Sequence, residues 1–229
     1  MPATWQTAEF TSTASRCSES FPLITRLSFE RMFPFGDPPD YTPPKEASIA
    51  AIAAREGRSS EDVAYDLLLA DEGNSFIFAA LTNYADYTLD ASAELLRHPN
   101  TIVGLSDGGA HVGFISDGSF PTFLLAHWGK VRGLPVQELV RRQTSDTARA
   151  AGLHDRGLLK VGMKADINVI DWDALTLERP GMLYDLPASG RRLMQKARGY
   201  DATIVAGAVT YRHGEATGAL PGKLVRCTA

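Results

Sequence analysis

Cysteine is scarce in this sequence. Only two cysteines, Cys17 and Cys227, occur among the 229 residues, and they lie near opposite ends of the chain. Two cysteines offer no patterned spacing for a disulfide framework, so we expect two unrelated free thiols. Such usage is typical of a reducing compartment, and we expect a cytoplasmic protein.

Long apolar runs are also missing. No segment approaches the roughly 20 apolar residues that a membrane-spanning helix requires, so we expect no membrane partner. Residues 1–10 contain no basic stretch followed by an apolar run, so we expect no secretory signal. Hydrophobic residues nevertheless make up 44% of the chain, which is the share expected of a globular protein with a proper core.

Charge of one sign is not concentrated anywhere. The net charge is −4, and acidic and basic residues are interspersed along the chain. A protein that binds nucleic acid usually carries a basic stripe or patch, so nucleic acid is not an expected partner. The phosphate-binding pattern Gly-x-x-x-x-Gly-Lys-Ser/Thr is absent as well.

Metal-binding histidine patterns are absent too. The sequence has no His-x-His and no His-Glu-x-x-His, so a self-contained zinc site is not visible. Most histidines stand alone, namely His98, His127, His154 and His213. A catalytic zinc ion needs about three protein ligands, and the chain offers only scattered candidates.

The first two thirds of the chain alternate between expected strands and helices. Residues 1–27 are rich in Ser and Thr and predict a tail or an irregular lead-in, and five prolines in residues 32–44 predict an extended loop. The expected helices cover 49–56, a segment that Ser59 caps and Gly73 ends, 90–96, 121–131, a segment that starts at Pro135, and a segment that Thr144 caps and Gly152 ends. The expected buried strands of a parallel sheet cover 76–81 and 101–105.

This βα rhythm predicts an α/β protein with a parallel sheet or barrel. The pattern changes after Gly152: residues 165–171 alternate like a strand, and residues 203–211 predict a hairpin around Ala206-Gly207. We therefore expect a β-rich segment beyond about residue 155.

The best candidate for chemistry is Asp107. It follows the expected strand 101–105 and precedes Gly108 and Gly109, which let the backbone turn sharply and leave room for a ligand. In barrels, catalytic groups emerge at the carboxyl ends of strands. Asp107 can serve there as a general base or as a metal ligand. The alternative is a carboxylate that only caps the following turn.

Two neighbours of Asp107 carry alternatives of their own. His111 lies four residues further, and it either ligates a metal directly or hydrogen-bonds near the site. Ser106 completes the bare pattern Gly-x-Ser-x-Gly of residues 104–108, which in hydrolases marks a nucleophilic serine between a strand and a helix. The residues after Gly109 do not open a clear helix, so the serine-hydrolase interpretation is disfavoured.

A family resemblance emerges from the order of several motifs. Residues 104–113, Gly-Leu-Ser-Asp-Gly-Gly-Ala-His-Val-Gly, look like the block around the catalytic aspartate of the amidohydrolase superfamily. Residues 142–153 and 155–171 resemble that superfamily's return from its barrel to a β-sandwich. Further segments are similar to the D-aminoacylase branch, namely 38–41, 63–68, 184–188, 206–209 and 217–222.

The resemblance implies the C-terminal part of a metal-dependent TIM-barrel hydrolase that acts on N-acyl-D-amino acids. It implies an incomplete barrel over residues 28–155 and a small β-sandwich segment over residues 156–229. The complete enzymes hold zinc with a His-x-His, a cysteine and further histidines, and the zinc polarises the amide carbonyl. Only Asp107 matches a functional position here, where it would carry the proton from water to the leaving amine. Cys17 lies outside the matching stretch.

The missing metal-binding histidines leave alternatives open. The chain can be a truncated product, or one that pairs with a complementary N-terminal half that bears the metal. It can also be a catalytically inactive binding or assembly module. Half a barrel leaves strand edges open, and open edges favour association, including homo-oligomers.

Overall fold

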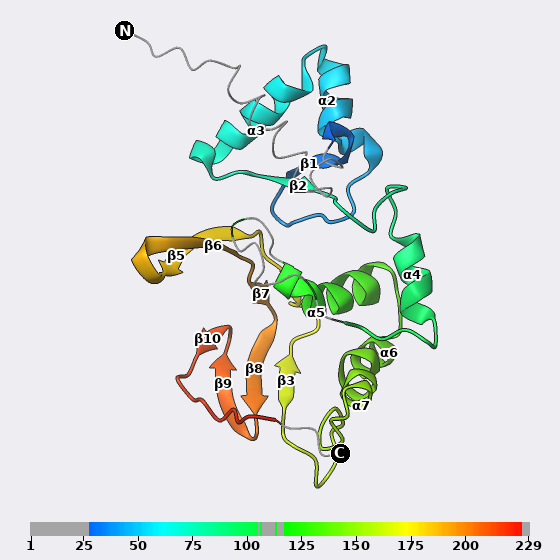
Figure 1. The fold of residues 1–229 in the computed structure, drawn as a ribbon, viewed down its shortest axis with the longest axis vertical. Helices are drawn as coiled ribbons and strands as arrows, with labels where there is room; N and C mark the ends of the chain where they lie inside the picture. The colour runs from blue at the N-terminus through cyan, green and yellow to red at the C-terminus, as the bar shows by residue number, and fades with distance from the viewer. Residues whose placement is uncertain (1–27, 105, 107–112, 114–116, 226–229) are drawn as a thin grey trace. The chain divides into compact units, whose positions relative to one another are not determined.

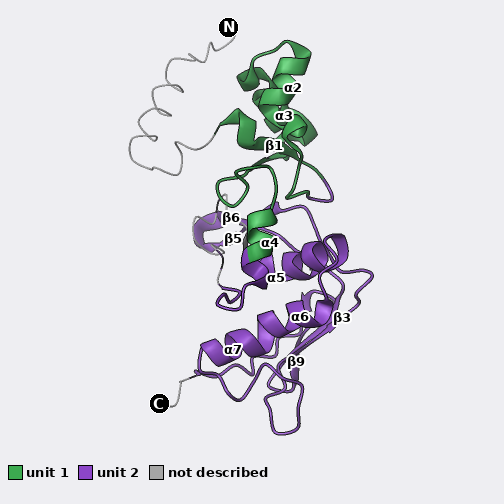
Figure 2. Cartoon of the chain, turned by 90° about the vertical axis from the view of Figure 1, so that its right-hand side faces the viewer, with its two compact units in different colours: residues 1–36, 40–94 green, residues 37–39, 95–229 purple. Residues whose placement is uncertain are grey.

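The computed structural model describes residues 28–104, 106, 113 and 117–225. Their contacts divide them into two compact units, which Figure 2 colours separately. Of the described residues, unit 1 comprises 28–36 and 40–94, and unit 2 comprises 37–39 and 95–225. The boundary falls within helix α4 (Asp90–Arg97), which forms where the sequence predicts it.

Two helices in unit 1 form where the sequence predicts them, but the second leaves helical geometry at Ala70, Asp71 and Glu72, before its predicted end at Gly73. In α2 (Ile49–Glu56), the Ser48 hydroxyl accepts a hydrogen bond from the Ala51 amide, and Gly57 ends the helix with φ of 65°. In α3 (Ser60–Gly73), the Ser59 hydroxyl accepts from the Asp62 amide at 3.1 Å. Ile49, Ala53 and Val63 bury their side chains together between the two helices.

The two strands of unit 1 form a small antiparallel sheet (Figure 1). Strand β1 (Met32–Phe35) pairs with β2 (Phe76–Ala79), so the prediction that 32–44 is entirely an extended loop is wrong at its start. The prediction of a parallel strand at 76–81 is wrong in its pairing. A two-stranded sheet consists of edge strands, and an edge tolerates Pro34 because its missing N–H can face away from the partner.

An aromatic cluster holds the proline-rich loop of unit 1 against this sheet. Phe33 is fully buried and meets Tyr84 edge to face, with ring centroids 6.4 Å apart. The Tyr84 hydroxyl donates a 2.8 Å hydrogen bond to the Pro43 carbonyl. Burial, and to a smaller degree the charge of Asp40, raises the pKa of Tyr84. The short 3₁₀ turns η2 (Phe29–Arg31) and η3 (Lys45–Ala47) complete this unit.

Unit 2 begins with helices in which α-helical and π-helical turns alternate. The first helical segment covers residues 117–131 and starts with the 3₁₀ turn η4 (Asp117–Ser119). Its range agrees with the helix predicted over 121–131. The second runs without interruption, so the prediction that Thr144 caps a separate helix is wrong: its hydroxyl donates to the Val140 carbonyl inside the helix. The elements are η4 (Asp117–Ser119), α5 (Phe120–Phe123), η5 (Leu124–Val131), α6 (Val136–Arg141), η6 (Arg142–Asp146) and α7 (Thr147–Ala150).

The segment Thr101–Gly104 is not a strand, contrary to the sequence-based prediction. Ile102 is 59% exposed, whereas a strand inside a parallel sheet would bury it. A strand requires a hydrogen-bonded neighbour, and in the part of the chain that the structure describes no strand pairs with these residues.

Beyond residue 155 the chain is rich in strands, as predicted. The main sheet has the order β10-β9-β8-β3, and the predicted hairpin is formed by β8 and β9 around Ala206 and Gly207, both with positive φ. The pairs β4–β7 and β5–β6 form two further antiparallel sheets. The bounds are β3 (Ile167–Ile170), β4 (Thr176–Leu177), β5 (Gly181–Leu186), η7 (Pro187–Ser189), β6 (Gly190–Met194), β7 (Ala197–Arg198), β8 (Tyr200–Val205), β9 (Ala208–Arg212) and β10 (Glu215–Ala216).

A junction of closely packed residues, Lys130, Trp172 and Leu175, joins the helices of unit 2 to its strands. The Lys130 ammonium donates to the carbonyls of Asp173 and Leu175, at 3.1 and 2.8 Å, and lies 5.5 Å from the centre of the Trp172 ring. Leu175 is 1% exposed. Because the cation contacts both the ring and the carbonyl of the buried leucine, the end of η5 is held against the residues that lead into β4.

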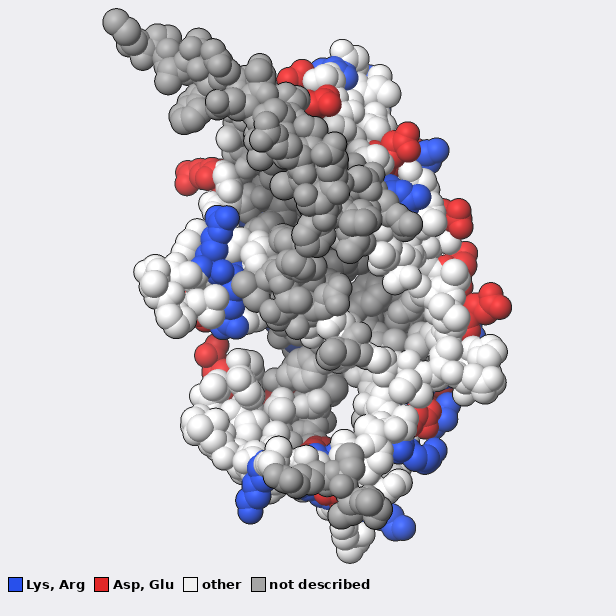
Figure 3. Space-filling view, viewed as in Figure 1, with Lys and Arg blue, Asp and Glu red and all other residues white. Residues whose placement is uncertain are grey.

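Helices and strands thus occur together, which agrees with the expected mixed class. None of the helices in the described ranges combines the length and apolar character needed to cross a bilayer. On the face shown in Figure 3, basic and acidic side chains of the described residues are interspersed.

Candidate functional site

The predicted catalytic loop lies largely outside the described residues. This applies to Asp107, Gly108, Gly109 and His111, so their roles stay predictions. Ser106 is described and is half-buried, directly before Asp107. What the structure does show is how the chain on both sides of this loop is held.

The segment before the loop is a compact turn that follows α4. The Thr101 hydroxyl donates to the carbonyls of Leu95 and His98, and the His98 ring accepts a hydrogen bond from the Asn100 amide through Nδ1 at 3.2 Å. This use of the imidazole orders the turn. His98 therefore has a structural partner, in line with its isolated place in the sequence.

Arg142 binds the same turn from the helix across from it. Its two terminal nitrogens donate to the Thr101 carbonyl at 3.2 Å and to the His98 carbonyl at 3.4 Å. Its Nε lies 3.6 Å from a carboxylate oxygen of Glu138. Arg142 is only 6% exposed, and an arginine so deeply buried requires such partners because its charge cannot be removed.

The segment after the loop is bound by the next residue of the same helix. The Gln143 side-chain amide donates to the Pro121 carbonyl at 2.9 Å. One residue further along α5, the buried Thr122 hydroxyl shares a 2.8 Å hydrogen bond with the hydroxyl of Tyr200 on β8. The chain that leaves the loop is thereby fixed both to η6 and to the main sheet.

Arg142 was not predicted from the sequence as a site residue, although the sequence contains a signal for it. Leu139, Arg142, Ser145 and Ala148 recur at intervals of three residues, and all four are buried. A charged residue that recurs with the apolar residues of a helix lies on the buried face, where its charge usually requires a hydrogen-bond or ion-pair partner. Arg141 does not belong to this three-residue series, and its side chain is 53% exposed.

The described histidines do not gather into a metal site. His127 stacks on Phe123 with ring centroids 4.7 Å apart, and His213 Nδ1 lies 3.5 Å from a carboxylate oxygen of Asp201. Within the described ranges, no three residues among His, Cys, Asp and Glu come together as metal ligands would. The residues that the structure describes therefore do not by themselves fit a metal centre.

The motif residues around Asp155 and Asp166 have structural partners. Arg156 binds the Asp155 carboxylate at 2.9 Å, and this hydrogen bond lowers the pKa of Asp155. Arg156 also reaches Asp166 at 3.4 Å, and Asp166 accepts the Ala206 amide at 2.8 Å. These residues therefore hold the loop before β3 against the turn of the β8–β9 hairpin. This structural role accounts for Asp155, Arg156 and Asp166 without a catalytic one.

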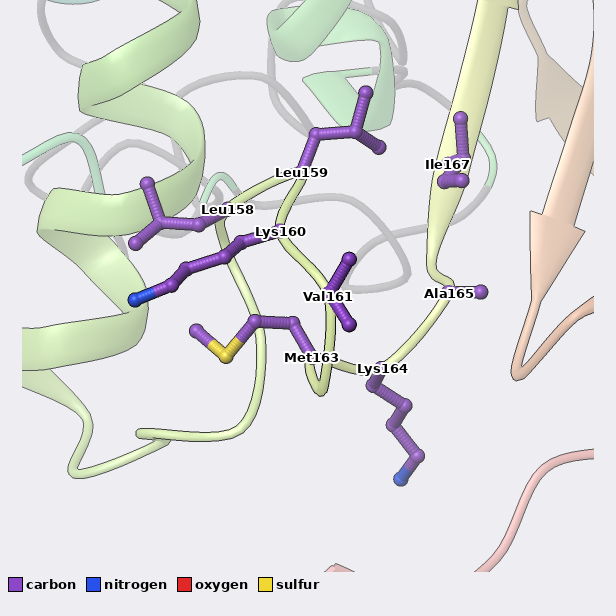
Figure 4. Close-up of a pocket in the computed structure, with 8 residues that line it drawn as sticks. All are labelled: Leu158, Leu159, Lys160, Val161, Met163, Lys164, Ala165 and Ile167. Carbon is purple, nitrogen blue, oxygen red and sulfur yellow. The ribbon is translucent and has the colours of Figure 1, made fainter.

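An open hollow of about 320 Å³ lies in that same loop, and Ser106, the predicted site residue that the structure describes, is not among its lining residues. Figure 4 shows its lining side chains around the bend that leads into β3. Leu159 is 85% and Val161 is 100% exposed, so the hollow is an apolar surface open to solvent and not an enclosed site. Its lining consists of Leu158, Leu159, Lys160, Val161, Met163, Lys164, Ala165 and Ile167.

Comparison with known proteins agrees with the resemblance seen in the sequence. The model of the amidohydrolase family matches residues 38–211, which is most of the chain. No curated protein matches the chain.

Solved structures of D-aminoacylase are similar to it at 22% identity with a TM-score of 0.43. One is described as defining a novel subset of amidohydrolases, one is a mutant in complex with copper chloride, and one concerns a binuclear metal centre. The matches cover 82% of this chain, which spans 36% of the length of each of those structures.

Proposed function

Because the chain belongs to the amidohydrolase family, we propose that it supplies one part of an active site that hydrolyses the amide bond of N-acyl-D-amino acids or related amides. The family match over residues 38–211 carries this proposal, since it includes the loop with Asp107. The D-aminoacylase branch rests on the motifs at 38–41, 63–68, 184–188, 206–209 and 217–222.

The proposed architecture follows the family. Residues 28–155 form the C-terminal part of a (β/α) barrel, residues 156–229 form a β-sandwich-type segment, and residues 1–27 lead in. The β-rich character of unit 2 beyond residue 155 supports the second segment. Within a complete barrel, the segment 101–105 would gain neighbouring strands, and its apolar residues Ile102 and Val103 would then be covered.

The proposed chemistry places Asp107 as the proton carrier. Its carboxylate accepts a proton from water while the water oxygen bonds to the amide carbon. The carboxylic acid then returns that proton to the nitrogen as the C–N bond breaks. The products are a carboxylic acid and an amine, the acid passes its proton to the amine to leave a carboxylate and an ammonium group, and Asp107 is again ionised. Ser106, Gly108, Gly109 and His111 would lie beside the substrate, with His111 as a hydrogen-bonding neighbour.

A metal is part of this proposal, and zinc is the proposed ion. When bound, it would polarise the carbonyl and lower the pKa of the attacking water. Asp107 is the one residue of this chain that we propose near it, as a candidate ligand. The other ligands would come from outside the described residues or from a complementary N-terminal half, because the described residues do not form a ligand set.

Substitution of Asp107 tests this proposal. In the complete enzyme, or in this chain complemented by its metal-bearing half, Asp107→Asn should lower kcat on N-acetyl-D-amino acids at least about 100-fold, as loss of a general acid–base group does. Asp86→Asn, which changes an exposed carboxylate in unit 1, should leave kcat unchanged. Turnover by Asp107→Asn that equals the unsubstituted enzyme would remove Asp107 from the role.

A second candidate function is assembly without catalysis. The observation that favours it is the exposed apolar loop of Leu158, Leu159 and Val161 next to β3, which is an edge strand of the main sheet in the described part of the chain. An open edge beside apolar side chains favours pairing with a second copy. A chain of this kind would associate and would hold no stoichiometric metal.

A further inference from the structure

The flanks of the loop that carries Asp107 are bound by two consecutive residues of one helix. Arg142 donates to the carbonyls of His98 and Thr101 on the incoming side, and Gln143 donates to the Pro121 carbonyl on the outgoing side. Residues 102–120, which include Asp107, lie between these anchor points. We propose that Arg142 and Gln143 form a two-sided clamp that positions Asp107 for the proposed reaction, on which this inference rests.

The position of both donors within a π-helical segment supports the clamp. Arg142 and Gln143 are the first residues of η6, where the helix departs from α-helical geometry. A π-helical turn changes the direction in which successive side chains leave the helix, and such turns are frequent at functional sites. Here the change accompanies two neighbouring side chains that bind two separate stretches of main chain.

Burial makes the incoming anchor rigid. Arg142 is 6% exposed, and the carboxylate of Glu138, one helical turn earlier, lies 3.6 Å from its Nε. The guanidinium holds its donors in a fixed plane, so it fixes the two carbonyls relative to each other as well as to the helix. The anchored carbonyl of Thr101 is close in sequence to Gly104 and Ser106, from which the chain continues to Asp107.

The outgoing anchor is tied further into the fold. Pro121 precedes Thr122, whose buried hydroxyl is hydrogen-bonded to Tyr200 on β8 at 2.8 Å. The outgoing chain is therefore bound on two sides, by Gln143 and by Tyr200. A catalytic group must be held within a fraction of an ångström, since a misplacement of about 1 Å can cost about 100-fold in rate. The clamp would contribute to this positioning by holding the main chain on both flanks of residues 102–120.

Matched variants in the complete or complemented enzyme test the clamp. Arg142→Met removes the donors at similar length, Arg142→Lys restores a positive charge that can reach one carbonyl, and Gln143→Met removes the second anchor. Arg141→Met, at the exposed neighbouring arginine, is the control. Steady-state kinetics on N-acetyl-D-amino acids give kcat and KM, and amide hydrogen exchange reports on residues 98–104 and, as an internal reference, on β8 and β9.

The expected result is a selective loss. Arg142→Met should lower kcat about 10- to 100-fold with a smaller change in KM, Gln143→Met should lower kcat less, and Arg142→Lys should recover part of the loss. Exchange in residues 98–104 should be faster in Arg142→Met, with exchange in β8 and β9 unchanged, which distinguishes a local release from general unfolding. Arg141→Met should match the unsubstituted enzyme.

Two outcomes overturn the clamp. One is unchanged exchange in residues 98–104 of Arg142→Met, and the other is faster exchange there with kcat unchanged. If Arg142→Met fails to fold, the milder Gln143→Met decides in the same way through kcat and the exchange of residues 117–123. If the unsubstituted enzyme releases no amino acid from any N-acyl-D-amino acid, the proposed function fails, and the exchange comparison alone decides whether the clamp holds the turn.

Discussion

Gly199 shows how much a single residue without a side chain can control. Its φ is +93°, and a Cβ placed there would lie 2.6 Å from Leu175 Cα and 2.7 Å from Leu175 N. Leu175 belongs to the junction in which Lys130 binds the start of β4. Since both clashing atoms are backbone, no side-chain rotation can relieve the contact, so the junction depends on glycine at this position.

We expect Gly199→Ala to destabilise the chain by about 2–3 kcal/mol, because it adds a backbone clash to an unfavourable φ. Urea unfolding followed by circular dichroism measures the loss. Gly162→Ala is the matched control, because Gly162 has φ of +90° and no atom within 4 Å of a Cβ placed there. Gly162→Ala should lose only the strain of its backbone, about 1 kcal/mol. Equal losses in both variants would contradict the clash with Leu175.

Ser59 sets the start of the longest helix of unit 1. Its hydroxyl accepts the Asp62 amide at 3.1 Å, one of the donors that the first turn of a helix leaves without a partner. Ser59→Ala should therefore lower the free energy of unfolding by about 1 kcal/mol, measured by urea titration, and Ser59→Asp should retain most of it. A loss in Ser59→Asp as large as in Ser59→Ala would show that something other than the cap sets the start of α3.

Helices were predictable from this sequence where local signals define them. The cap at Ser59 and the glycine at 57 act within one turn, so sequence and structure agree on the end of α2 and the start of α3. The predicted end of α3 at Gly73 is wrong, because the backbone already leaves helical geometry at Ala70. The hairpin around Ala206-Gly207 is equally local. Thr144 does not start a helix, because a threonine inside a helix can donate its hydroxyl hydrogen to a carbonyl one turn earlier, as Thr144 does to Val140.

The pairing of strands was predictable only where the partner is near in the sequence, as in the β8–β9 hairpin. β1 and β2 pair across more than forty residues of chain, and nothing in either segment specifies that partner or its antiparallel direction. Residues 101–104 have the apolar composition of a buried strand but no pairing in the described part of the chain. Composition specifies what a segment can become, and its neighbours decide whether it does so.

At the scale of the whole molecule, the family was predictable and the site geometry was not. Motif order over most of the chain pointed to amidohydrolases, and the family match over 38–211 confirms this. The geometry of a site, however, depends on contacts between segments that are far apart in the sequence, and motif order does not specify those contacts. Arg142 was missed for a related reason: its partners, His98 and Thr101, lie more than forty residues earlier.

The exposed loop before β3 leads to a prediction about the assembly of the molecule. Leu159 and Val161 are 85% and 100% exposed, and burying two such side chains against a second copy would contribute about 1.5–3 kcal/mol each. We expect sedimentation equilibrium to show a dimer that dissociates on dilution.

The double change Leu159→Lys and Val161→Lys should then raise the dimer's Kd at least about tenfold, since about 1.4 kcal/mol corresponds to that factor. Leu220→Lys, at an apolar residue 94% exposed in the C-terminal segment, should leave the Kd unchanged. A chain that sediments as a monomer at every accessible concentration would reject pairing through this loop and leave the hydrolase proposal untouched, because none of the proposed site residues belongs to this loop.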